Sequence, residues 1–215
     1  MQNRGKRAES GFSLVELVTV VAIVLVLGSF AVISTEVSTA NSKANAAAAQ
    51  VISQFRAARE LAISKRRNVQ ITFTAPNQIQ MTVLTLTGET PATAVPAVYL
   101  NDNAAGGATF FVFPSLPDTP MAFGNSNAIT FAPASGGTTG LSVMFSSSGS
   151  LVGTTATSGF SSVGSNNPVN ASIFVAVAGQ TSTARAITVL GTTGRVRSYY
   201  WAGPATGGTS TNWQE

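Results

Sequence analysis

An uninterrupted apolar stretch near the N-terminus constrains this chain more than any other feature. Residues 12–33 read FSLVELVTVVAIVLVLGSFAVI, and Glu16 is the one charged residue among them. As a helix this stretch would be about 33 Å long, which matches the hydrocarbon thickness of a bilayer. Three of the first seven residues are basic, whereas only Lys43 follows the stretch within ten residues. The sequence therefore predicts a transmembrane helix whose N-terminal end stays in the cytoplasm.

A secretory signal peptide is the alternative interpretation of the same residues. It would have a basic leader and an apolar core, and the small residues Ser38 and Ala40 resemble a cleavage site. The apolar core of a signal peptide is usually only about 7 to 15 residues long. Because this stretch is longer and includes the carboxylate of Glu16, a retained helix is the favoured interpretation.

The segment that follows, residues 34–67, predicts an amphipathic continuation of the same helix. It is rich in alanine and contains neither glycine nor proline. Four of its apolar residues recur at i, i+4, i+7 and i+11, which is helical spacing: Val51, Phe55, Ala58 and Ala62. Three cations end the segment, as is favourable at a helix C-terminus: Lys65, Arg66 and Arg67.

After residue 67 the sequence changes to short β-rich runs separated by Gly, Pro and Asn, which predicts strands. The predicted strands are Val69–Ala75, Gln78–Leu86, Thr109–Phe113, Ala128–Phe131, Leu141–Phe145, Ser172–Ala178, Ala186–Leu190 and Arg195–Trp201. No second long helical pattern follows, so we expect an α+β fold with one mainly antiparallel sheet, covered on one face by the second half of the helix.

The composition argues against most enzyme chemistry. The chain has no histidine and no cysteine, which removes the usual general base, the thiol nucleophile and thiolate zinc sites. The only two aspartates, Asp102 and Asp118, lie in Pro/Gly/Asn-rich segments and are interpreted as turn residues rather than as a catalytic pair. We therefore expect no catalytic site, no metal and no cofactor.

The string GFSLVE at residues 11–16, placed between a basic leader and the apolar run, resembles the N-terminal signal of type IV pilins and type II secretion pseudopilins. The resemblance implies removal of residues 1–11 by a prepilin peptidase that cuts between Gly11 and Phe12, and N-methylation of Phe12. It also implies that Glu16 pairs with the Phe12 amino group of the next subunit and sets the filament register. A carboxylate held at headgroup level near a helix N-terminus is the alternative interpretation of Glu16.

Three further strings are similar to the GspH and FimT types of minor pseudopilin and minor pilin. They are QFRAARELAISKRRNVQITF at 54–73, VMFSSSGSLVG at 143–153 and AITVLGTTGRVR at 186–197. The resemblance implies a pilin-like fold, an inner-membrane protein with a periplasmic C-terminal domain, and assembly with other pilins into a pilus or pseudopilus. Its other expected partners are the peptidase that also methylates the N-terminus and, before assembly, membrane lipid.

The last predicted strand offers an alternative function. Strand alternation would place Arg195, Arg197 and Tyr199 on one face, and the cations of residues 65–67 could extend this row. Some FimT-type minor pilins bind DNA through a Gly-Arg-x-Arg segment at this place, which implies a role in DNA uptake. A solvated strand face is the favoured interpretation.

The sequence predicts five segments in the chain. They are a leader (1–11), an apolar helix (12–33), its continuation (34–67), a β-rich domain (68–201) and a flexible tail (202–215).

Overall fold

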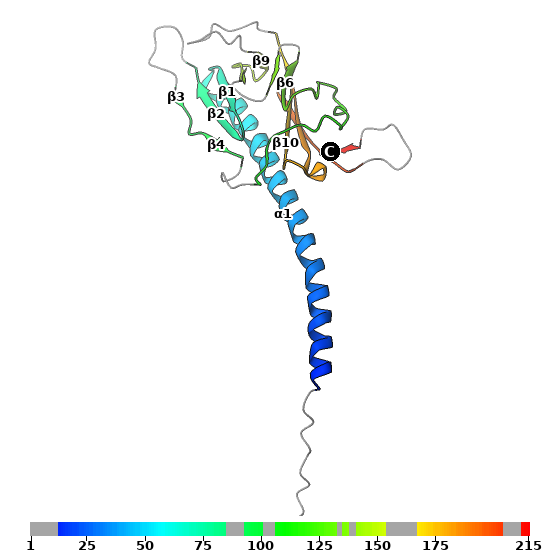
Figure 1. Cartoon of the computed structure of the whole chain (residues 1–215). Coiled ribbons are helices and arrows are strands. Elements are labelled where there is room, and N and C mark those ends of the chain that lie inside the picture. The colour runs from blue at the N-terminus through cyan, green and yellow to red at the C-terminus, as the bar shows by residue number, and fades with distance from the viewer. Residues whose placement is uncertain are drawn as a thin grey trace, which may run out of the picture. The chain divides into compact units, whose positions relative to one another are not determined.

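The structure is a computed structural model that describes residues 13–84, 93–100, 106–132, 135–137, 141–153, 167–203 and 212–215. Helix α1 (Leu14–Lys65) is 52 residues long, and the chain divides into two compact units, Met1–Thr39 and Ala40–Glu215. The helix therefore begins in the first unit and ends in the second (Figure 1). The expected helix is confirmed at both ends to within two residues among the residues described.

The described residues of the second unit form two antiparallel sheets. In the first, the order is β3 (Thr93–Ala94), β2 (Gln78–Val83), β1 (Val69–Thr74), β8 (Leu141–Phe145) and β9 (Leu151–Gly153), and β4 (Val98–Tyr99) also pairs with β2. In the second, the order is β13 (Trp213–Gln214), β12 (Arg195–Trp201), β11 (Arg185–Leu190), β10 (Asn170–Ala176), β6 (Ile129–Ala132) and β7 (Ser135–Gly137), and β5 (Thr109–Phe110) pairs with β10. A short 3-10 helix, η1 (Thr181–Thr183), joins β10 to β11.

The α+β fold is confirmed, and the expectation of one sheet is wrong. β1 turns at residues 75–77 into β2, so the two strands form a hairpin, and β8 and β12 have the predicted bounds. β1 pairs on its other edge with β8, whereas β10 pairs with β11, β5 and β6 in the second sheet. Local sequence patterns predict where strands lie but not which distant strand each one pairs with. The strand pairing is what divides the strands between two sheets.

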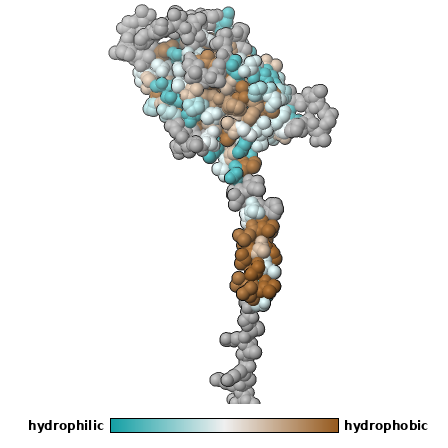
Figure 2. Space-filling model, in the orientation of Figure 1, coloured by the Kyte–Doolittle hydropathy of each residue, from teal (hydrophilic) through white to brown (hydrophobic). Residues whose placement is uncertain are grey.

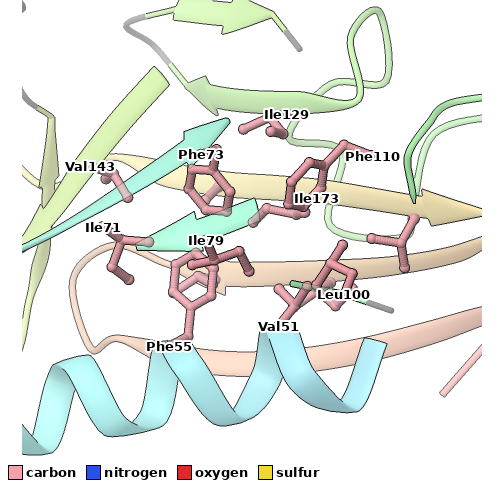
Figure 3. Packing of buried hydrophobic residues seen from close by; sticks show 14 of the residues in the cluster. Val51, Phe55, Ile71, Phe73, Ile79, Leu100, Phe110, Ile129, Val143 and Ile173 are labelled. Atoms are coloured by element: carbon pink, nitrogen blue, oxygen red, sulfur yellow. The ribbon is translucent and has the colours of Figure 1, made fainter. Parts of the chain in front are cut away.

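The main core lies between α1 and the two sheets. Phe55 of α1 is fully buried, with its ring centroid 6.0 Å from Phe73 of β1 and 6.0 Å from Phe145 of β8. Phe73 in turn contacts Phe131 of β6 at 6.0 Å, which joins the two sheets. Figure 3 shows Val51 and Phe55 pointing from the helix toward the strands. The predicted helical stripe at 51, 55, 58 and 62 is confirmed, because all four residues are completely buried.

The opposite face of the second sheet is also covered. A second apolar cluster contains Phe174 of β10, Tyr199 of β12 and Trp213 of β13, together with partly buried residues between Val112 and Met121. Trp213 is buried, and its indole Nε1 donates a hydrogen bond of 2.9 Å to the Pro117 carbonyl oxygen. This corrects two expectations. The sheet is not covered on one face only, and residues 212–215 of the predicted flexible tail are held by strand β13.

Candidate functional site

The first candidate site is the apolar start of α1. Eleven apolar residues from Leu14 to Leu27 are each 48 to 80% exposed, and Figure 2 shows this part of the helix as almost entirely hydrophobic. They follow one another so closely that every side of the helix is apolar, because 3.6 residues make one turn. Soluble monomers rarely expose contiguous apolar patches of this kind, so this surface indicates a partner.

A membrane is one such partner, provided that a helix is long and apolar enough to cross it. Over the described residues, no helix combines the length and the hydropathy that crossing a bilayer requires. The transmembrane helix expected over residues 12–33 is not supported by this finding and stays a prediction from the sequence.

Glu16 lies in the first turn of α1, within this apolar surface. Its side chain is exposed, and no ion pair of its carboxylate is present among the residues described. A carboxylate in the first turn of a helix is stabilised by the helix dipole, so the position is favourable without a partner. The two processing residues, Gly11 and Phe12, lie outside the described residues, and their role and the register role of Glu16 stay predictions.

The second candidate site is strand β12. Arg195, Arg197 and Tyr199 alternate along the strand and therefore lie on one face, as predicted. Arg195 is exposed, but Tyr199 is only 4% exposed and belongs to the second apolar cluster. The ring is packed inside the protein, so it cannot stack on a nucleic-acid base in this conformation.

Arg197 is engaged by its neighbours in the same unit. Its Nη1 atom lies 3.3 Å from Oε2 of Glu215, next to strand β13. A side-chain hydrogen bond with Tyr199 and the negative charge of Glu215 raise the pKa of the Arg197 guanidinium. The side-chain carboxylate of Glu215 thus partly neutralises the row of cations, and Arg195 is the member of the row that remains exposed.

The three cations at the end of α1 lie where the helix terminates. Lys65 is the last helical residue, and Arg66 takes a left-handed backbone conformation with φ of 50° that ends the helix. The amide N–H of Arg67 donates to the Ala62 carbonyl at 3.1 Å, which closes the last turn. These residues end the helix, and the extension of the Arg195 row by the cations of residues 65–67 stays a prediction.

Arg59 is a residue that the sequence did not single out. It lies near the C-terminal end of α1, and its Nε donates a hydrogen bond to the Gly149 carbonyl oxygen at 3.3 Å. A Cβ added to Gly194 would overlap that same carbonyl oxygen and lie 2.8 Å from Cδ of Arg59. The Phe145-to-Gly149 turn, the Gly194 turn and α1 therefore meet at one point, which we name the glycine corner (Gly149, Gly194 and Arg59).

Gly194→Ala is expected to destabilise the protein by about 2 kcal/mol or more. Gly194 has φ of +64°, where a Cβ costs about 1 to 2 kcal/mol, and the overlap at the glycine corner adds to this cost. The matched control is Gly179→Ala, because Gly179 has φ of +82° but open space around it. Denaturant unfolding followed by the fluorescence of Trp201 and Trp213 measures both variants. Equal losses in the two variants would show that packing at the glycine corner contributes nothing.

Asp118, one of the two aspartates, organises a loop. Its carboxylate oxygens accept hydrogen bonds from the backbone N–H groups of Thr119 at 2.7 Å and Gly124 at 2.8 Å. Asp102 lies outside the described residues. Among the residues that are described, no group of three or more histidine, cysteine or acidic side chains is placed to hold a metal ion.

Comparison with known proteins adds little to this geometry. No model of a protein family matches the chain, and no curated protein matches it. Two crystal structures of the type IV minor pilin FimU of Pseudomonas aeruginosa are similar to it, with TM-scores of 0.40 and 0.41 and sequence identities of 14% and 16%. The alignments cover 72% and 76% of this chain and 90% of each FimU chain. Similarity at this level carries no argument about function.

Proposed function

We propose that this chain is a minor subunit of a pilin-like filament, either a type II secretion pseudopilus or a type IV pilus. In this proposal a prepilin peptidase removes residues 1–11, and the apolar helix that starts at Phe12 holds the protein in the inner membrane. On assembly the helix leaves the lipid and packs among the helices of other subunits. The second unit, Ala40–Glu215, stays on the periplasmic side.

The observation that carries the proposal is the exposed apolar surface of α1 between Leu14 and Leu27. A helix that is apolar on every side is stable only in lipid or among other helices. Copies that pack head to tail through such helices form an open helical filament, because each copy presents a different surface to the next. The string GFSLVE supports the same proposal from the sequence.

The chemistry of Glu16 fits this assembly. A carboxylate at the bilayer centre costs about 2.5 to 3.5 kcal/mol, and less near the helix start. A positively charged N-terminal amine of a neighbouring subunit would neutralise it once the helices are packed together. An incorrectly placed subunit would leave Glu16 buried and unpaired, so the pair would select one axial register.

Fractionation of the cells that encode this protein tests the proposal. We expect the protein in the membrane fraction when assembly is blocked and in sheared filaments when it proceeds. Recovery in neither fraction would contradict the proposal.

DNA binding is the alternative function, and the buried ring of Tyr199 argues against it. We expect the full chain in a neutral detergent to give weak or no retardation of duplex DNA at low salt. Electrostatic binding is strongest at low salt. The logarithm of the binding constant falls with the logarithm of the salt concentration, with a slope of about −0.9 for each phosphate neutralised, so two arginines would make a weak site. Micromolar binding that Arg195→Ala combined with Arg197→Ala abolishes would instead make DNA uptake the leading function.

A further inference from the structure

A hollow of about 450 Å³ lies in the second unit, between α1 and the helix-facing side of the second sheet. Asn45, Ala49 and Ile52 line it from the helix. Arg185 of β11 and Ser198 and Tyr200 of β12 line it from the sheet. The proposed filament assembly uses the apolar surface between Leu14 and Leu27 and does not involve this hollow.

Arg185 is the unusual member of the lining, because it is a buried cation. It is only 8% exposed. Its guanidinium donates to four neutral oxygens: Asn45 Oδ1 at 2.7 Å, Asn41 Oδ1 at 3.2 Å, and the carbonyls of Ser182 at 3.0 Å and Ala184 at 2.9 Å. No carboxylate pairs with it among the described residues. Burial lowers the pKa of Arg185, against a smaller opposing effect of Tyr200, yet an arginine stays charged at neutral pH.

A buried positive charge without a negative partner favours an anion. Burying an unpaired charge is costly, and the hydrogen bonds to neutral oxygens offset only part of that cost. A guanidinium has five N–H donors, so the four bonds leave one donor at Nη2 for a ligand. Within the described residues the hydroxyl of Ser198, on the same wall, has no recorded partner and supplies a second donor.

Beside these polar groups, the lining has an apolar and accessible part. Ala49 is exposed, Ile52 is half-buried, and Tyr200 is 42% exposed with its ring centroid 6.0 Å from Cζ of Arg185. The Tyr200 hydroxyl donates to the Gln214 side chain, which holds the ring in place. An aliphatic wall and an aromatic wall beside one cation suit a ligand with an apolar body and a single negative charge.

We propose that this hollow binds a small amphipathic carboxylate. Its carboxylate accepts hydrogen bonds from Arg185 and Ser198, and its apolar body lies against Ile52, Ala49 and the ring of Tyr200. The proposal does not depend on filament assembly, since every residue that it uses lies within Ala40–Glu215.

Benzoate and benzamide form the matched pair of probes, because they share a shape and differ in charge. Each is titrated into the full-length protein in a neutral detergent, with binding followed by ligand-observed NMR. We expect benzoate to bind about tenfold or more tightly than benzamide, because a hydrogen bond between two charged groups is stronger than one to a neutral amide. Equal affinities, or no binding of benzoate, would overturn the proposal.

A steric variant tests the place without disturbing the buried arginine. Ala49→Phe adds a ring at an exposed helical position that lines the hollow, and we expect it to weaken benzoate binding about tenfold or more. The control is Ala57→Phe, at an exposed position of the same helix outside the hollow, which should bind benzoate as the unmodified protein does. Unchanged binding in Ala49→Phe, or equal loss in both variants, would place the benzoate elsewhere and overturn the proposal. If benzoate bound only when self-association is prevented, the hollow would be a contact surface between copies of this chain. That result would also overturn the proposal.

Discussion

Glu16→Ala is expected to lower recovery of the protein in sheared filaments by about tenfold or more, while membrane insertion and leader cleavage continue. Removing the carboxylate leaves the neighbouring amine buried and unpaired, and breaking a buried ion pair in this way costs about 3 to 5 kcal/mol. Insertion is unaffected because an alanine at this position makes the helix more apolar. Quantitative mass spectrometry of the filament and membrane fractions gives both values.

Glu36→Ala is the matched control for this prediction. It removes an exposed carboxylate from the same helix, 20 residues further along and outside the GFSLVE string. We expect filaments to take up this variant normally. If Glu16→Ala were also taken up normally, the register role would be wrong and Glu16 would be a headgroup-level residue that the helix dipole stabilises.

Gly11→Trp is expected to block maturation almost completely, so that the full-length precursor accumulates. Glycine has no side chain, which lets the backbone at the cut lie close to the protease at the membrane surface. An indole at the same position would hold the peptide bond away from the catalytic groups. The intact mass of the protein extracted from membranes distinguishes the precursor from the mature chain, which lacks the first 11 residues.

Gly5→Trp is the control for this second prediction. It places the same indole in the leader but six residues before the cut. We expect normal maturation of this variant. Efficient maturation of Gly11→Trp would contradict cleavage between Gly11 and Phe12.

Local patterns in the sequence predicted the elements whose signals are long and regular. The helical spacing at Val51 and Phe55 predicted a buried helical face, and both side chains are fully buried in the structure. The runs at Leu141–Phe145 and Arg195–Trp201 predicted β8 and β12 with their observed bounds. β4 and β9 have only two or three residues, which is too short for a periodic pattern, and they were not predicted. The predicted strand Thr109–Phe113 is wrong in length, since β5 includes only Thr109–Phe110.

Long-range contacts could not be predicted, and they decide what the candidate site can do. Alternation correctly placed Tyr199 on the face of Arg195 and Arg197, but it could not show that Phe174 and Trp213 cover the Tyr199 ring. Trp213 lies in a Gly/Ser/Thr-rich region that is typical of a mobile tail, so its burial required the pairing of β13 with β12.

The buried Arg185 was missed for the same reason. Arg185 is a single charge that precedes a predicted strand by one residue, and the usual expectation for such a residue is exposure. Its partners Asn41 and Asn45 are more than 100 residues away in the sequence. One signal was available, since Arg185 ends a run without any charged residue that starts at Thr119. An isolated charge in such a run is a reason to look for a specific role.

The intact mass and N-terminal sequence of the mature protein, purified from the cells that encode it, test the central claim most directly. The proposal predicts that the chain begins at Phe12, that this residue carries an N-methyl group, and that the apolar helix is retained. A mature chain that begins near Asn41 would contradict it, because the apolar stretch would then be a secretory signal peptide and no apolar part of the helix would remain to enter a filament.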